Sequence, residues 1–176
     1  MAQSPPRAGR LPIQQLQTVA NLLKTPALAR LYANILQHGP VTVSEVLDDL
    51  DLPQETAYDY VQILETACLV EKTREQRPYE YGAESIALTL STDGETQTIT
   101  PALIGAVARR DEDIDVYIER HGLDCLATAL EYAYEYVDGT VTHRIVAREL
   151  DLSALEAKIT LQALEPVATE YADAGV

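Results

Sequence analysis

The chain has 176 residues, carries a formal net charge of −15, and contains neither Phe nor Trp. This length allows one sizeable core or two small ones, and hydrophobic residues make up 47% of the sequence, as in a globular protein. No apolar run approaches the roughly 20 residues that cross a bilayer, which excludes a membrane-spanning protein and favours a cytoplasmic one.

The first elements are an arm and two helices. Residues 1–12, MAQSPPRAGRLP, lack an apolar signal core and are predicted to form a disordered arm. Apolar residues then recur at helical spacing over residues 13–23. Thr25 and Pro26 predict the start of a second helix, because a hydroxyl caps a helix and proline suits its first turn. This helix is expected to end at Gly39.

Residues 39–65 have the pattern of a helix-turn-helix. Thr42 and Glu45 have capping-box spacing, which predicts a short helix that ends near Leu50. A third helix is predicted from about Pro53 to Cys68, with a buried stripe made of Ala57, Val61, Leu64 and Cys68. Early positions on its opposite face would meet base edges in such a motif. The candidate DNA-binding residues on this helix are Gln54, Thr56, Tyr58 and Gln62.

A hairpin follows the third helix. Residues 69–74 and 79–81 are strand-like and flank a polar tip, which predicts the wing of a winged helix-turn-helix. The densest basic cluster of the sequence lies here, and its members are the candidate DNA-binding residues Lys72, Arg74 and Arg77. They would contact phosphate or a minor groove. The alternative is a solvated hairpin whose cations are balanced by neighbouring glutamates.

The region after the wing predicts a second hairpin and three helices. Residues 86–100 alternate and turn at Asp93-Gly94, a strong hairpin signal, and are expected to extend the wing sheet. The first domain is therefore expected to span residues 13–100. Helices are predicted over residues 101–109, 112–120 and 123–137.

The helix-turn-helix occurs twice in the sequence. Shifted by 100 positions without a gap, residues 127–165 match residues 27–65 with 15 identities in 39 pairs. The third helix of the second copy carries apolar residues where a recognition helix needs a polar face, so we expect it to be buried. These residues are Leu155, Ile159, Leu161 and Leu164. Pro166 is expected to interrupt this helix and to leave no wing, so residues 101–176 are predicted to form a packing or dimerisation unit.

The predicted fold is therefore mainly α with a small β-hairpin wing: a winged helix-turn-helix followed by a second, wingless helix-turn-helix-like helical unit. The three histidines lie far apart in the sequence, without the spacing of a metal site, and no Gly-rich phosphate loop is present. No catalytic residue, metal site or cofactor is predicted, and we do not expect an enzyme.

One segment carries a family resemblance. The pattern P-x-x-T-A-Y-x-Y-V-x-x-L-E-x-A-x-L-V-E-K from Pro53 to Lys72, followed by R-P-Y-x-Y from Arg77 to Tyr81, resembles archaeal winged helix-turn-helix transcriptional regulators. The likeness is to haloarchaeal proteins of the broad ArsR/TrmB-like kind and covers residues 26–82. It implies a third helix in the major groove and a hairpin against the DNA backbone. Recognition helices of that family usually carry Arg or Lys, whereas this one carries Glu55 and Asp59.

The acidic composition bears on partners. The chain has 28 acidic residues against 13 basic ones, which is typical of proteins from salt-accumulating halophiles. In molar salt the Debye length is about 3 Å, so carboxylates repel each other little and the absence of a basic patch does not exclude DNA binding. The leading hypothesis is a homodimeric, sequence-specific regulator of a halophilic archaeon that binds double-stranded DNA. The alternative is a winged-helix interaction module that binds a protein of the transcription machinery and no DNA.

Overall fold

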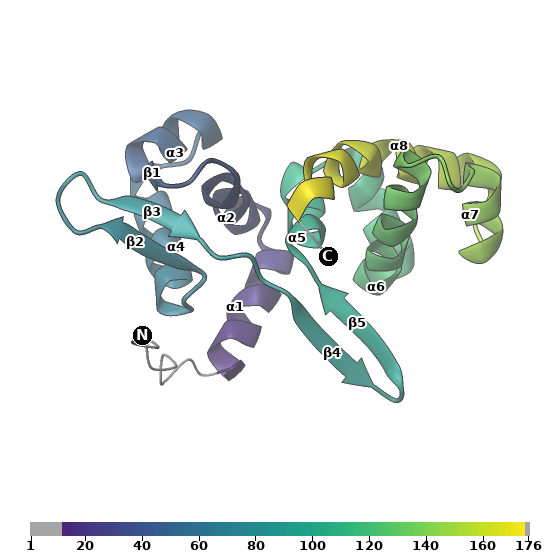
Figure 1. Cartoon of the computed structure of the whole chain (residues 1–176), viewed down its shortest axis with the longest axis horizontal. Coiled ribbons are helices and arrows are strands. Elements are labelled where there is room, and N and C mark those ends of the chain that lie inside the picture. Colours follow the sequence, from purple (N-terminus) through teal and green to yellow (C-terminus); the bar gives the residue numbers. More distant parts are fainter. Residues whose placement is uncertain (1–11, 175–176) are drawn as a thin grey trace, which may run out of the picture. The chain divides into compact units, whose positions relative to one another are not determined.

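The computed structural model describes residues 12–174 and divides the chain into two compact units, residues 1–86 and residues 87–176 (Figure 1). The fold is mainly helical with small antiparallel sheets, in agreement with the predicted class. The predicted arm lies outside the described residues, apart from Pro12, which begins the first helix. The units divide after Ile86, whereas the sequence placed the end of the first domain at residue 100.

Unit 1 is built around its second helix. Its helices are α1 (Pro12–Lys24), α2 (Pro26–His38), α3 (Val43–Leu50) and α4 (Gln54–Thr66). Pro26 takes the first position of α2 as predicted, although the Thr25 side chain caps no described amide. Leu31, Tyr32 and Ile35 of α2 are almost completely buried. Burial of one such side chain stabilises the fold by roughly 1.5–3 kcal/mol, so α2 is the centre of this core.

The start of α3 is fixed by reciprocal hydrogen bonds between Thr42 and Glu45. The amide of Glu45 donates to Thr42 Oγ1, and the amide of Thr42 donates to Glu45 Oε2 at 2.7 Å. Two otherwise unsatisfied amides are thereby paired, and the predicted capping box is confirmed. Asp51 then ends α3 in the left-handed conformation, with φ 51°, and turns the chain toward α4.

The buried stripe of α4 is shorter than predicted. Ala57, Val61 and Leu64 are buried as expected. Cys68 is not part of the stripe, because the helix ends at Thr66 and Cys68 has a left-handed backbone with φ 57°. Its side chain is only half-buried. Leu69, which follows directly, is buried instead and begins the connection to the wing.

The wing is a three-stranded antiparallel sheet in the order β1-β3-β2. Its strands are β1 (Val41–Thr42), β2 (Val70–Arg74) and β3 (Glu80–Ala83). Tyr81 pairs with Val41 on one side and with Lys72 on the other, so β3 is the central strand. The Tyr32 hydroxyl donates to the carbonyl of Glu84 at 2.6 Å and ties the end of the wing to α2.

The second hairpin does not extend the wing sheet. β4 (Leu88–Thr92) and β5 (Glu95–Ile99) form a separate two-stranded sheet within unit 2 and turn at Asp93-Gly94 as predicted. The expectation was wrong: β4 and β5 pair with each other, while β3, the strand that leads into this hairpin, has β1 on one edge and β2 on the other. A strand that follows β3 therefore finds no edge of it to pair with.

Unit 2 is helical beyond its hairpin. Its helices are α5 (Pro101–Arg109), α6 (Glu112–Val137), α7 (His143–Glu149) and α8 (Ala154–Glu170), followed by a 3₁₀ turn over Ala172–Ala174. Gly122, with φ 85° and ψ 170°, breaks α6 into the two segments that the sequence predicted separately. α8 packs along α6 and α7 and forms the main core of this unit.

Pro166 lies inside α8 and does not interrupt it. The helix continues to Glu170, so the prediction that Pro166 interrupts it was wrong. A proline within a helix removes one backbone hydrogen bond and bends the helix. Val167 and Ala168, the next two residues, are buried, and their packing holds the following turn in place.

The second copy of the helix-turn-helix repeats the backbone of the first. Asp151 is left-handed with φ 54°, as Asp51 is with φ 51°. The buried positions also recur 100 residues on: Val46 with Val146, Ala57 with Ala157, Val61 with Leu161 and Leu64 with Leu164. The order of elements also agrees. In the first copy α1 precedes α2, and in the second copy the first segment of α6 precedes its second segment.

Candidate nucleic-acid interface

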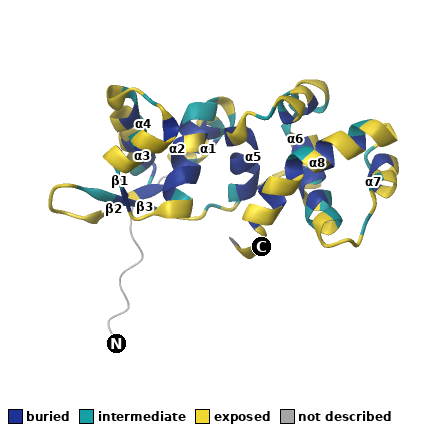
Figure 2. Ribbon diagram, turned by 90° about the horizontal axis from the view of Figure 1, so that it is seen from above, coloured by how far each residue is buried: buried dark blue, intermediate teal, exposed yellow. Residues whose placement is uncertain are grey.

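The outward face of α4 is polar and accessible. Gln54, Tyr58 and Gln62 are exposed, with Tyr58 50% exposed, and Thr56 is half-buried. These positions face outward because Ala57, Val61 and Leu64 turn the opposite side of the helix into the core. Figure 2 shows α4 with buried residues on one face and exposed residues on the other. All four residues proposed for this helix therefore lie on, or at the edge of, one surface.

Two carboxylates share this surface. Glu55 lies in the first turn of α4 and Asp59 one turn further on, and both are exposed. Glu55 is favourably placed near the helix N-terminus, where the helix dipole is positive. Both carboxylates repel phosphate, so the face is suited to hydrogen bonding with base edges more than to attraction by charge.

The wing brings its three basic residues together, but two of them have acidic partners. Lys72 Nζ lies 3.6 Å from Glu65 Oε1, and Arg74 Nη1 lies 3.5 Å from Glu80 Oε1. Arg77 is exposed in the turn between β2 and β3, a loop that Figure 2 shows, and it has no carboxylate within ion-pair distance among residues 12–174. Of the three cations, Arg77 is therefore the one that a phosphate meets without displacing a glutamate.

Tyr79 is a member of this cluster that the sequence reasoning missed. Lys72 Nζ lies 4.8 Å from the centre of the Tyr79 ring, and Arg77 Cζ lies 5.9 Å from it. Cation–π contacts of this kind order long side chains and are worth about 0.5–1 kcal/mol at exposed sites. The signal was the position of Tyr79 two residues after Arg77, in the same hairpin as Lys72.

A groove of about 570 Å³ lies beside α4 on its C-terminal half. It runs between α1 and α4, and Gln14 and Gln17 of α1 face Asp59 and Gln62 of α4 across it. Gln62 therefore lies next to α1, whereas Gln54 and Tyr58 belong to the half of α4 near its start. Sequence reasoning assigned no role to α1, because a helix-turn-helix pattern says nothing about the helix before it.

The corresponding helix of the second copy has a different surface. Leu155 is 68% exposed and Ile159 is 38% exposed, whereas Leu161 and Leu164 are buried. The expectation that all four are buried was wrong for the first two, since they occupy the same outward positions as Glu55 and Asp59. Of the two arginines of α7, Arg148 pairs with Glu149 at 3.1 Å.

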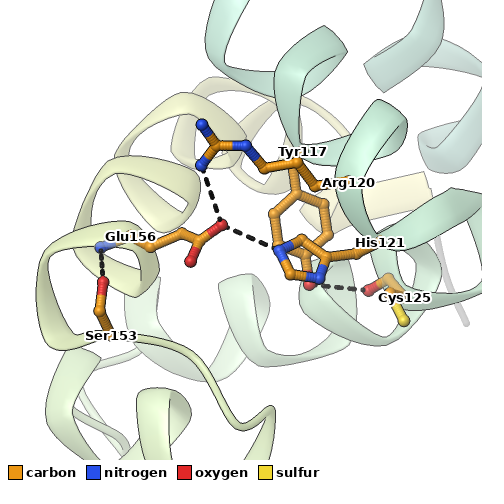
Figure 3. A network of polar contacts seen from close by, with 6 residues as sticks. All are labelled: Tyr117, Arg120, His121, Cys125, Ser153 and Glu156. Atoms are coloured by element: carbon orange, nitrogen blue, oxygen red, sulfur yellow. Dashed lines mark hydrogen bonds and ion pairs between the residues drawn. The ribbon is translucent and has the colours of Figure 1, made fainter.

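Beside the two exposed apolar residues of α8, a polar network joins α6 to α8. Glu156 Oε1 lies 2.9 Å from His121 Nε2 and 3.6 Å from Arg120 Nη1, as Figure 3 shows. The hydrogen bond from His121, helped by the charge of Arg120, lowers the pKa of Glu156 below 4.5. Tyr117, whose ring lies 4.7 Å from that of His121, is buried, and burial raises its pKa to about 12.

Residues 12–174 contain no group of three or more His, Cys, Asp or Glu residues arranged to hold a metal ion. The same residues include no helix long and apolar enough to cross a membrane.

Comparison with protein families assigns the two ends of the chain separately. Residues 25–86 match the family described as sugar-specific transcriptional regulator TrmB, and residues 108–173 match a family of unknown function, DUF7437. Comparison with curated proteins and with solved structures gives no match. Unit 1 thus has a winged helix-turn-helix fold and is similar to the TrmB family, whose members are transcriptional regulators with a DNA-binding winged helix. The TrmB part of the predicted resemblance is confirmed, and its archaeal and ArsR-like parts remain predictions.

Proposed function

We propose that the chain is a sequence-specific transcriptional regulator that binds double-stranded DNA as a homodimer in the cytoplasm of a halophilic archaeon. The observation that carries this proposal is the exposed polar face of α4 within a domain that matches the TrmB family. The net charge of −15 supports a halophilic source, because molar salt screens most of the repulsion among so many carboxylates.

In this proposal the outward face of α4 enters the major groove. The amides of Gln54 and Gln62 suit adenine edges, which offer one acceptor and one donor side by side. Glu55 suits the amino group of cytosine. Tyr58 adds a hydroxyl and an apolar ring, and Thr56 a hydroxyl. Base contacts of these kinds give sequence discrimination without requiring strong attraction to phosphate.

The wing contributes the phosphate contacts. Arg77 is the principal cation, since DNA must compete with Glu65 for Lys72 and with Glu80 for Arg74. Few phosphates are neutralised in this arrangement, so the affinity falls only slowly as salt rises. A regulator with this wing keeps its operator bound in salt that would release a strongly basic protein.

Fluorescence anisotropy on genomic fragments in molar KCl tests the proposal. Arg77→Ala is expected to reduce the slope of log K against log[KCl] by about one, because one phosphate contact is lost. Tyr58→Ala is expected to lose about 1–3 kcal/mol of discrimination between sites with the slope unchanged. Arg144→Ala, an exposed arginine of the second copy, is the control and should change neither. Absence of saturable binding contradicts the proposal.

A second candidate is a protein interaction module that binds a component of the transcription machinery and no DNA. It is favoured by the seven acidic and no basic residues of residues 39–65, and by the carboxylate partners of Lys72 and Arg74. A pull-down that recovers a stoichiometric protein after nuclease digestion, and loses it with Glu55→Lys and Asp59→Lys, supports this candidate against the first.

A further inference from the structure

α8 presents an apolar face to solvent, and nothing among the described residues of unit 2 covers it. Leu155 is 68% exposed, and Ile159 one turn later is 38% exposed. Val116, on the first segment of α6, is also 38% exposed. We call these three residues, together with Asp113 and Lys158, the α8 face. Single exposed apolar residues are ordinary, but three on two adjacent helices form a patch that a binding partner would cover.

A groove of about 320 Å³ lies within this face. Its walls come from the first segment of α6 and the first half of α8, and they include Val116, Leu155 and Ile159. The Arg120–Glu156–His121 network crosses between the same two helices and fixes their spacing (Figure 3). Leu155, the most exposed of the three apolar residues, stands at the rim. The face thus carries both a projecting leucine and a hollow beside it.

A projection and a hollow on one surface are what an interface between identical copies requires. In a two-fold dimer, every contact occurs twice. If residue i of the first copy contacts residue j of the second, then residue j of the first copy contacts residue i of the second. An axis that runs between Leu155 and the groove sets each leucine opposite the groove of the other copy. Leu155 and the groove are then both covered by the second copy, and no different partner is needed for either.

The charges around the face agree with a second copy as the occupant. Asp113 lines the α6 side of the groove, and helical spacing puts the exposed Lys158 on the side of Leu155 away from the groove. Neither has an ion-pair partner among the described residues. The same two-fold axis brings Lys158 of one copy toward Asp113 of the other. The face lacks the cluster of cations that marks a nucleic-acid site, because the groove is lined by one arginine, Arg120, against the carboxylates of Asp113 and Glu156.

We propose that the α8 face binds the same face of a second copy of this chain, and is the surface of the homodimer on which the proposed function rests. Apolar contact is strengthened by salt, and repulsion between two chains of charge −15 is screened by it. Dimerisation therefore strengthens as KCl rises, whereas DNA binding weakens.

Sedimentation velocity of the full chain, without DNA, over a series of concentrations and KCl levels is the test. The wild-type chain should reach about twice the monomer mass of 19.3 kDa and should do so at lower protein concentration in molar KCl. The double variant Leu155→Glu with Ile159→Asp should raise the dimer Kd at least about tenfold, because it would desolvate charges at the centre of the interface. These substitutions give α8 the type of residues that α4 has at positions 55 and 59.

Ile145→Glu is the matched control. Ile145 is 39% exposed in the same unit and does not line the groove, so its substitution should leave the dimer Kd unchanged. Thermal unfolding verifies that both variants fold. A wild-type chain that stays monomeric in molar KCl, or a dimer that the double variant leaves intact, overturns the inference. A dimer that binds no DNA fragment leaves it standing and removes the proposed function instead.

Discussion

The two copies of the helix-turn-helix share a backbone and differ in the surface they present. α4 and α8 begin after the same kind of left-handed aspartate and bury the same positions, yet α4 exposes Glu55 and Asp59 where α8 exposes Leu155 and Ile159. The fold of the motif therefore depends on its turn and its buried stripe, while the outward face is set independently. A helix-turn-helix identified from its buried pattern alone says nothing about what it binds.

The largest loss of stability is expected from shortening a buried side chain at equivalent positions of the two cores. Leu64 and Leu164 are both completely buried, and their replacement by alanine should each cost about 2–5 kcal/mol. Since the units are separately compact, hydrogen exchange measured by mass spectrometry should speed up in α3 and α4 for Leu64→Ala, and in α7 and α8 for Leu164→Ala. Faster exchange in both units from either variant would contradict independent cores.

A smaller difference in stability is expected between alanine substitutions of two glycines at equivalent positions of the two copies. A Cβ at Gly39 would lie 2.5 Å from the carbonyl oxygen of Ile35, whereas Gly139 has open space around it but a φ of 74°. Gly139→Ala should cost about 1–2 kcal/mol, the strain of a left-handed alanine. Gly39→Ala should cost more, because backbone must move. Chemical denaturation of both variants measures the difference, and equal costs would show that the clash relaxes freely.

The N-caps of α3 and α7 should differ in the stability they contribute, by about the contribution of one side-chain hydrogen bond. Thr42 accepts from the Glu45 amide, whereas the equivalent Thr142 caps no described amide. Thr42→Ala is expected to cost about 1 kcal/mol, and Thr142→Ala close to nothing. Urea unfolding curves of the two variants provide the measurement. A comparable loss for Thr142→Ala would mean that its hydroxyl caps α7 in solution.

The smallest effect is a dependence on pH at the start of α3 that the start of α7 should not share. Hydrogen bonds from the Thr42 amide and hydroxyl hold the pKa of Glu45 below its ordinary value of 4.5. Because the folded pKa is depressed, this stabilisation is complete above about pH 4.5 and is lost as pH falls through the folded pKa. The Tm difference between wild type and Glu45→Gln should therefore shrink toward pH 3. Ile145→Gln, at the equivalent position, should show a difference independent of pH.

Local signals predicted much of the fold. Thr42 and Glu45 located the start of α3, Pro26 and Pro101 the starts of α2 and α5, and the 100-residue repeat located α7 and α8. Each of these signals acts within one helical turn or through direct comparison of two segments. The relation of α1 to the first segment of α6 was missed, because those helices share their place in the order of elements and hardly any residues.

What the sequence could not predict depends on contacts between distant residues. β1 takes one edge of β3 from some 40 residues away, and the second hairpin forms a sheet of its own. The pairing of Lys72 with Glu65 requires the end of α4 to lie beside β2. For the candidate site, residue types placed Gln54, Tyr58 and Arg77 on exposed surfaces, but which cations are neutralised and what Tyr79 contacts emerge only from the folded wing.

The groove between α1 and α4 gives the winged domain a second surface next to its recognition helix. Gln14 and Gln17 line one wall, and the other wall is the back half of the helix whose front half carries Gln54 and Tyr58. Any molecule that enters this groove touches Asp59 and Gln62 directly. Under the proposed function, a molecule bound in this groove would contact Gln62, one of the residues proposed to meet DNA.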